Sequence, residues 1–210
     1  MSAKSFQIRT CPSCGLRYPL VDEVTFGIRC PACLSETRLA HEGKLIRERT
    51  PSVPLLSTDR KIAVLLDNIR SAGNVGSILR TAEGFGFVQV FLCGITPTPE
   101  HDAVLKTSLG AEDAVPWSYH KDAVKLVKGL KAEGWKVFAL EEDANGKPIR
   151  RLESLKTDSI LIIGNEITGV DPDLLSLSEQ VFYIPMRGEK KSFNVAVAFG
   201  IAAYALTASD

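Results

Sequence analysis

Short apolar runs recur along the last 150 residues of the chain and alternate with stretches of helical spacing. Five of these runs are rich in Val, Ile and Phe and carry few polar positions: residues 61–67, 88–94, 135–140, 159–164 and 180–185. Strands covered on both faces have this pattern, whereas strands with one wet face alternate apolar and polar residues. The runs therefore predict five buried β-strands.

Segments with helical spacing lie between these runs. They cover residues 75–84, 101–109, 121–132 and 171–177, and Pro172 suits the first turn of the last of them. Alternation of strands and helices predicts an α/β fold with a parallel sheet and helices on both faces. In such sheets ligands bind beyond the carboxyl ends of the strands, so we expect the functional site in the loops that follow the runs.

The longest apolar run, from Phe193 to Leu206, comes last in the chain. Asn194, Gly200 and Tyr204 interrupt it, and it is shorter than the ~20 apolar residues that a membrane span requires. It therefore predicts a helix buried on all sides, with Ser192 as its N-cap. The first ten residues hold no apolar stretch typical of a secretion signal, so we expect a soluble cytoplasmic protein without membrane contact.

The chain has 210 residues, of which 45% are hydrophobic, enough for one ordinary domain and a small additional module. We expect a module at 1–45, a proline-containing linker at 46–60 and the main domain at 61–210. The net charge is zero, but residues 1–60 hold nine Lys or Arg against six Asp or Glu, and the remainder holds sixteen against nineteen. This balance permits a nucleic-acid partner without indicating one.

Four of the five cysteines form two C-x-x-C pairs separated by fifteen residues. They are Cys11, Cys14, Cys30 and Cys33. Two such turns supply the four thiolates of a tetrahedral zinc site, and the module is too small to fold by hydrophobic burial alone. Disulfides or a redox pair are the alternatives, and a cytoplasmic chain disfavours both. The spacing therefore predicts structural zinc in a zinc-ribbon-like module, and Cys93 is expected to be a buried strand residue.

Several arginines surround the paired cysteines. Arg9, Arg17, Arg29 and Arg38, together with Tyr18 and Phe26, form either a surface that contacts phosphates and stacks on bases or a solvated basic face around the metal.

The loops after the first, fourth and fifth runs are rich in Gly, Asn and charge: "DNIRSAGNVGSILR", "GNEITGVDP" and "PMRGEKKSFN". Neither the dinucleotide-binding pattern G-x-G-x-x-G nor the phosphate-binding pattern G-x-x-x-x-G-K-[ST] occurs at these positions. Rossmann dehydrogenases, P-loop enzymes and glycine-rich class I methyltransferases are therefore disfavoured.

In order and spacing, the stretches "NIRSAGNVGSILRTAEGFG", "LIIGNEITGVD" and "IPMRGEKKSFNVAVAFGIAAY" resemble the three motifs of the SpoU/TrmH family of SPOUT RNA methyltransferases. The resemblance covers about residues 61–208. It implies transfer of a methyl group from S-adenosylmethionine to a ribose 2′-hydroxyl of tRNA or rRNA, a C-terminal trefoil knot, and a homodimer in which the partner completes the site.

The resemblance also implies roles for individual residues. The expected catalytic residues are Asn74, Arg80, Glu166, Ser192 and Asn194, and the expected cofactor-binding residues are Gly164, Ile184, Met186 and Phe193. Since an arginine is a poor base, Arg80 is expected to hold a phosphate beside the target ribose. Gly164 is expected to let the backbone approach the cofactor.

Structural roles are the alternatives for single residues in this set: Glu166 as a cap of the next helix, Ser192 as an N-cap only, and Asn74 in a turn with left-handed geometry. For the whole chain, a catalytically silent RNA-binding protein of the same fold is the alternative function. Methylation of a base or of a small molecule is a third hypothesis.

Overall fold

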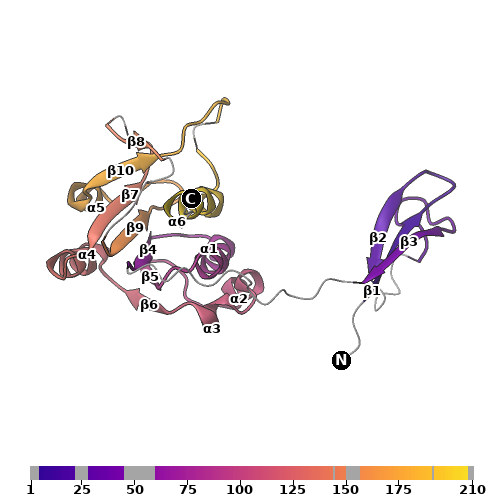
Figure 1. Ribbon diagram of the computed structural model, residues 1–210, viewed down its shortest axis with the longest axis horizontal. Coiled ribbons are helices and arrows are strands. Elements are labelled where there is room, and N and C mark those ends of the chain that lie inside the picture. The colour runs from indigo at the N-terminus through magenta and orange to yellow at the C-terminus, as the bar shows by residue number, and fades with distance from the viewer. Residues whose placement is uncertain are drawn as a thin grey trace. The chain divides into compact units, whose positions relative to one another are not determined.

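The computed structural model describes residues 5–21, 28–44, 60–143, 145–149, 157–190 and 192–207. The chain divides into two compact units, Met1–Leu56 and Ser57–Asp210 (Figure 1). Each unit is described here by itself. Residues 46–59, which make up nearly all of the predicted linker, lie outside the described residues.

The smaller unit contains a three-stranded antiparallel sheet in the order β2-β1-β3. Its strands are β1 (Ser5–Thr10), β2 (Arg17–Val21) and β3 (Arg38–Lys44). The first cysteine pair lies in the turn between β1 and β2. The second pair lies in a turn that is closed by an antiparallel bridge between Arg29 and Glu36. The two cysteine turns therefore come from neighbouring loops of one small sheet.

The larger unit is built on a seven-stranded sheet in the order β6-β5-β4-β9-β7-β10-β8, and every pair of neighbours is parallel. The strands are β4 (Ile62–Asp67), β5 (Gln89–Cys93), β6 (Trp117–His120), β7 (Lys136–Leu140), β8 (Lys147–Pro148), β9 (Ser159–Ile163) and β10 (Gln180–Tyr183). All five predicted strands are confirmed. The pattern missed β6 and β8, which are the two edge strands, because their few residues have no continuous apolar run.

Helices cover both faces of this sheet, as predicted (Figure 1). They are α1 (Ala72–Gly84), α2 (Asp102–Ser108), α3 (Ala111–Ala114), α4 (Ala123–Ala132), α5 (Pro172–Leu177) and α6 (Val195–Thr207). Alternate residues of β4 point to opposite faces, so that Val64 and Leu66 join a core with α1 and α6, whereas Ala63 and Leu65 join a second core with α4 and α5. The α/β fold with a parallel sheet is confirmed, and the trefoil knot stays a prediction.

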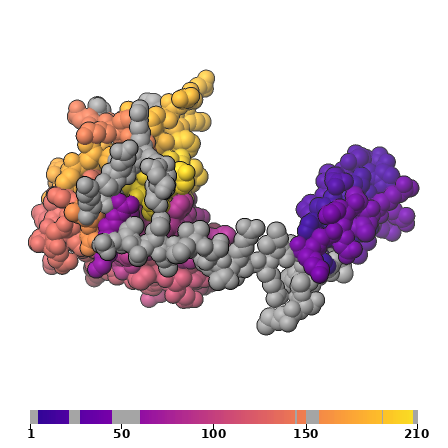
Figure 2. Space-filling view, in the orientation of Figure 1, coloured from indigo at the N-terminus to yellow at the C-terminus, as the bar shows by residue number. Residues whose placement is uncertain are grey.

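The C-terminal helix α6 differs in two ways from the expectation. Its N-cap is Asn194, whose side-chain oxygen accepts a hydrogen bond from the Ala196 N–H at 2.9 Å; Ser192 lies two residues before the cap. Burial on all sides is also wrong for the single chain, because Val197 is 51% exposed and Tyr204 is 63% exposed. Yellow atoms of this segment reach the surface of the larger unit in Figure 2. Only the opposite side of α6, around Phe199, is buried.

Among the described residues, the helices are all too short or too polar to cross a lipid bilayer.

Candidate active site

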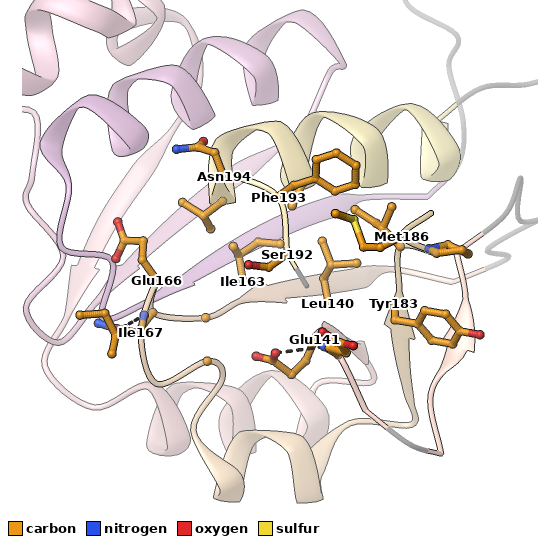
Figure 3. A pocket seen from close by; sticks show the side chains of 18 residues that line it. Leu140, Glu141, Ile163, Glu166, Ile167, Tyr183, Met186, Ser192, Phe193 and Asn194 are labelled. Carbon is orange, nitrogen blue, oxygen red and sulfur yellow. Dashed lines mark hydrogen bonds between the residues drawn. The ribbon is translucent and has the colours of Figure 1, made fainter. Parts of the chain in front are cut away.

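A pocket of about 790 Å³ opens beyond the carboxyl ends of β7, β9 and β10 (Figure 3). All four predicted cofactor-binding residues line it: Gly164, Ile184, Met186 and Phe193. Three of the predicted catalytic residues line it as well: Glu166, Ser192 and Asn194. In Figure 3, Glu166 and Asn194 lie at one end of the pocket and Met186 at the other. The structure therefore brings seven of the nine predicted residues to one cavity.

A chain of side-chain hydrogen bonds joins three of the predicted catalytic residues. The Asn194 Nδ2 group donates to Asn74 Oδ1 at 3.0 Å, and the Asn74 Nδ2 group donates to Glu166 Oε1 at 3.0 Å. Asn74 lies in the first turn of α1, Glu166 follows β9, and Asn194 begins α6. Loops far apart in the sequence are thus connected through these three side chains.

Glu166 binds the beginning of α1 through its whole carboxylate. Besides the Asn74 bond, its oxygens accept hydrogen bonds from the N–H groups of Arg70 at 2.9 Å and Ser71 at 3.1 Å. The alternative role as a cap of the next helix, α5, is wrong, because Asp171 caps α5. Partial burial by itself would raise the pKa of Glu166, but the hydrogen bonds that it accepts outweigh burial and hold the pKa below its ordinary value.

We expect Glu166→Gln to weaken the larger unit at neutral pH and to flatten its acid unfolding. A carboxylate with a lowered pKa contributes stability that is present above its ordinary pKa and is lost as the pH falls through the lowered one. Urea unfolding at pH 7 and about pH 3.5 measures this, and both tryptophans of the chain, Trp117 and Trp135, report on the larger unit. A difference between variant and wild type that is equal at the two pH values would contradict the assignment.

Arg80 lies away from the pocket of its own chain. It is exposed on α1, six residues after Asn74, which places it about 9 Å further along the helix and about 120° around it. It does not line the pocket, and within the described part of the chain it has no hydrogen-bonded or ion-paired partner. The single chain therefore does not assemble all five predicted catalytic residues.

Gly164 is required by the turn that follows it, and its role beside the cofactor stays a prediction. A Cβ atom at Gly164 would collide with the backbone of Gly169 and Val170. That turn is closed by two backbone hydrogen bonds between Asn165 and Gly169, and the Asn165 side chain donates to the Asn68 carbonyl at 2.6 Å. The missing side chain thus lets the turn fold back on its strand and shape the pocket wall.

Sequence reasoning missed several residues of the pocket. Glu141 and Glu142 line it directly after β7, and the Glu141 carboxylate accepts from the Val170 N–H at 2.9 Å. Their position at the end of a predicted strand was the available signal, because that is where ligands bind. With Glu166 they give the described lining three carboxylates and no lysine or arginine. The pocket therefore favours a ligand that carries positive charge.

Arg70 is a further residue that the sequence analysis did not select. Its N–H group donates to Glu166, which fixes its backbone beside the side-chain network of Glu166, Asn74 and Asn194. Its side chain is exposed.

Buried polar groups hold the neighbouring loops together. Asp67, at the end of β4, accepts hydrogen bonds from the Asn68 side chain at 2.7 Å and from the Asp171 N–H at 2.9 Å. Burial raises the pKa of Asp67, and these two bonds offset only part of that effect. Asn68 has a left-handed backbone, with φ of 57°. The loop before α1 is thereby fixed against the loop before α5.

The four predicted zinc ligands meet in the smaller unit. Their Sγ atoms lie within 4.8 Å of one another, with Cys11 to Cys33 and Cys14 to Cys30 both at 3.5 Å. Tetrahedral zinc with Zn–S bonds of about 2.3 Å places its sulfur atoms about 3.8 Å apart. The arrangement fits one structural zinc ion with all four positions taken by protein.

The two cysteine turns have the same backbone geometry. In each turn the N–H four residues after the first cysteine donates to the carbonyl of that cysteine, from Gly15 to Cys11 and from Leu34 to Cys30. Both donors have left-handed backbones, with φ of 78° and 58°. Equivalent turns of this kind are expected when each presents one pair of thiolates to a shared ion.

Metal analysis should find one zinc ion per chain. We expect Cys30→Ser to lower this to about 0.1 or less, because a structural zinc site needs its full ligand set. Cys93→Ala is the matched control, since Cys93 is a buried residue of the larger unit, and it should keep the metal. Mass spectrometry of the metal content checks both. Loss of zinc in the control, or its retention in Cys30→Ser, would contradict the assignment.

Comparison with known proteins agrees with the resemblance that the three sequence motifs indicate. Residues 61–204 match the model of the SpoU rRNA Methylase family. The chain is 36% identical over 153 residues to the 23S rRNA (guanosine(2553)-2′-O)-methyltransferase of Bacillus subtilis, covering 72% of this chain and 59% of that protein. It is 30% identical to the tRNA (guanosine(18)-2′-O)-methyltransferase of Thermus thermophilus, with 80% of each chain covered.

A solved structure supports the same conclusion. The AdoMet-bound rRNA methyltransferase of Sinorhizobium meliloti has a TM-score of 0.65 and 28% sequence identity, and the match covers 69% of this chain and 55% of that one. The chain therefore spans less than two thirds of the Bacillus relative and of this structure. The match to the family model, which takes in the pocket and the three hydrogen-bonded side chains at its end, shows that this chain belongs to the SpoU rRNA methylase family.

Proposed function

We propose that the protein transfers a methyl group from S-adenosylmethionine to a ribose 2′-hydroxyl of tRNA or rRNA. The observation that carries this proposal is the network of Asn194, Asn74 and Glu166 at one end of the pocket. The relatives support the same reaction, since their names describe 2′-O-methylation of guanosine in tRNA and 23S rRNA.

The pocket suits this cofactor. Apolar side chains such as Ile184 and Phe193 line it and can contact an adenine ring, and its three carboxylates favour a ligand with a sulfonium and an ammonium group. When bound, S-adenosylmethionine supplies an electrophilic methyl group. The remaining task of the protein is to place the ribose hydroxyl in line with that methyl group.

Each predicted catalytic residue has a positioning task in this reaction. Glu166 holds the beginning of α1, so that Asn74 faces Asn194. Ser192, which lines the pocket with an exposed side chain, binds the ribose by hydrogen bonding. Arg80 holds the neighbouring phosphate, and a phosphate oxygen takes the proton of the hydroxyl, because a guanidinium cannot.

A homodimer would bring Arg80 to the pocket of the partner subunit. Apolar side chains are exposed on α6 and just after α1: Phe85, Val88, Val197 and Tyr204. The rings of Phe85 and Tyr204 lie 6.5 Å apart and form one continuous surface. A second copy packed on this apolar surface would cover it and complete the site. The predicted trefoil knot would hold the C-terminal segment in place beneath that surface.

The zinc-binding unit, residues 1–45 in this proposal, selects the RNA and is joined by the linker 46–60 to the catalytic domain 61–210. The reaction takes place in the cytoplasm, where tRNA and rRNA are found.

The proposal is tested by incubating the pure protein with S-adenosylmethionine labelled in its methyl group and with total tRNA and rRNA. Nucleoside analysis should place the label on ribose. Cofactor binding without any transfer would favour the catalytically silent RNA-binding protein, and label on a base would favour the third hypothesis. Absence of both transfer and cofactor binding would overturn the proposed function.

A further inference from the structure

One face of the small sheet carries arginines and rings but no acidic residue. Residues paired directly across antiparallel strands point to the same face. Thr10 pairs with Arg17 and Arg38, Ile8 pairs with Pro19 and His41, and Phe6 pairs with Val21 and Gly43. We call this set the arginine face: Phe6, Ile8, Thr10, Arg17, Pro19, Val21, Arg38, His41 and Gly43.

Contacts between side chains agree with this register. The rings of Phe6 and His41 lie 6.4 Å apart, and a Cβ atom built on Gly43 would meet the Phe6 ring. The Phe6 ring therefore lies across the backbone of β3 beside His41. Arg17, Arg38 and His41 are exposed, and Phe6 is half-buried. The arginine face thus presents two neighbouring rings and two accessible guanidinium groups.

On the opposite face, Arg9 and Tyr18 make hydrogen bonds within the unit. The Arg9 guanidinium donates to Thr37 Oγ1 at 2.7 Å and to Gln7 at 2.8 Å. The Tyr18 hydroxyl donates to the carbonyl of Arg29 at 3.3 Å. Of the residues that the sequence suggested for an RNA surface, Arg9 and Tyr18 therefore lie on the face opposite Arg17 and Arg38, and Phe26 lies outside the described residues.

The spacing and charge of the arginine face suit a single strand of nucleic acid. Arg17 and Arg38 are on the two outer strands, which places their backbones about 10 Å apart. Guanidinium groups bind phosphates in a bidentate manner, and rings on a sheet stack on unpaired bases. The described residues of the face include no carboxylate that would repel a phosphate.

We propose that the arginine face binds a single-stranded segment of the substrate RNA, with Arg17 and Arg38 on phosphates and Phe6 and His41 against bases. This inference rests on the proposed function, in which RNA is the substrate. It goes further by naming the surface of the zinc-binding unit that contacts the RNA and the form of RNA that it takes.

The test uses the full-length, zinc-loaded protein and a fluorescein-labelled oligo(U) strand of about 12 nucleotides, followed by anisotropy at several salt concentrations. We expect the Arg17→Ala/Arg38→Ala double variant to bind at least about tenfold more weakly. The slope of the logarithm of its binding constant against the logarithm of the salt concentration should be less steep by about 1.4, since two phosphate contacts are lost. His41→Ala should weaken binding by about five- to a hundredfold through lost stacking.

Two further variants serve as controls. Lys44→Ala removes an exposed cation from β3, the strand that also carries Arg38, but from the opposite face of the sheet. This variant should bind within about twofold of wild type. Arg17→Lys/Arg38→Lys keeps both charges without the bidentate geometry and should lie between wild type and the alanine variant. Zinc content is measured for every variant, so that a loss of binding is not mistaken for loss of the fold.

The proposal is overturned if wild type does not bind oligo(U), if the double alanine variant binds as well as wild type, or if Lys44→Ala loses as much affinity as the double alanine variant. Methyl transfer is measured separately. Transfer by the wild type together with unchanged RNA binding by the double variant would reject the arginine face alone. Absence of transfer together with weakened binding by the double variant would reject the proposed function and support the arginine face.

Discussion

Replacing Arg80 with Ala is expected to lower kcat/KM for RNA by about two to three orders of magnitude while leaving the affinity for S-adenosylmethionine nearly unchanged. Arg80 does not line the pocket of its own chain, so its loss leaves the cofactor contacts intact. What is lost is the cation that would hold the phosphate beside the target ribose. Calorimetry of cofactor binding and initial rates of methyl transfer measure the two effects. Arg80→Lys should recover only part of the rate, since it keeps the charge but not the bidentate geometry.

A mixing experiment decides from which chain Arg80 acts. Arg80→Ala and Asn194→Ala are each expected to be inactive as homodimers. If Arg80 reaches the pocket of the partner, a heterodimer of the two variants has one intact site, and an equal mixture after subunit exchange should regain about a quarter of wild-type activity. If Arg80 served its own pocket, the mixture would stay inactive. Recovery of activity would therefore support the shared site, and an Arg80→Ala enzyme of normal rate would remove Arg80 from the mechanism.

The second large effect is expected for Gly164→Ala. The added methyl group collides with the backbone of Gly169 and Val170, which no side-chain rotation can relieve. We expect the larger unit to lose about 1 to 3 kcal/mol of unfolding free energy, because overpacking of a tight site forces the backbone to move. Since the displaced turn forms one wall of the pocket, the affinity for S-adenosylmethionine should fall at least tenfold. Urea unfolding followed by tryptophan fluorescence and calorimetry measure these changes.

Gly129→Ala is the matched control for this substitution. Gly129 lies in α4, and a Cβ atom built there meets no other atom within 4 Å. The same change should therefore raise helix stability by up to about 1 kcal/mol and leave cofactor binding unchanged. A Gly164→Ala protein that bound the cofactor like wild type would show that the turn does not shape the pocket.

Local sequence patterns were sufficient to predict most strands and helices of the larger unit. Buried parallel strands leave continuous apolar runs, and the five runs became β4, β5, β7, β9 and β10. The edge strands β6 and β8 escaped because they are short and only partly buried on their faces, so they contain no continuous apolar run. Ser192 was mistaken for the cap of α6 because Ser and Asn are both good N-caps and lie two residues apart. Only the hydrogen bonds of Asn194 distinguish them.

The sequence by itself determined the parallel α/β fold, the four thiols of the metal site, and the loops in which the pocket lies. These follow from periodicity and spacing, which are local properties of the chain. The tertiary structure alone decided that Glu166 binds the start of α1, that Gly164 serves a turn, that Arg80 faces away from its own pocket, and that the arginines of the small sheet divide between two faces. Contacts between distant segments depend on how strands order and pair, and no local pattern carries that information.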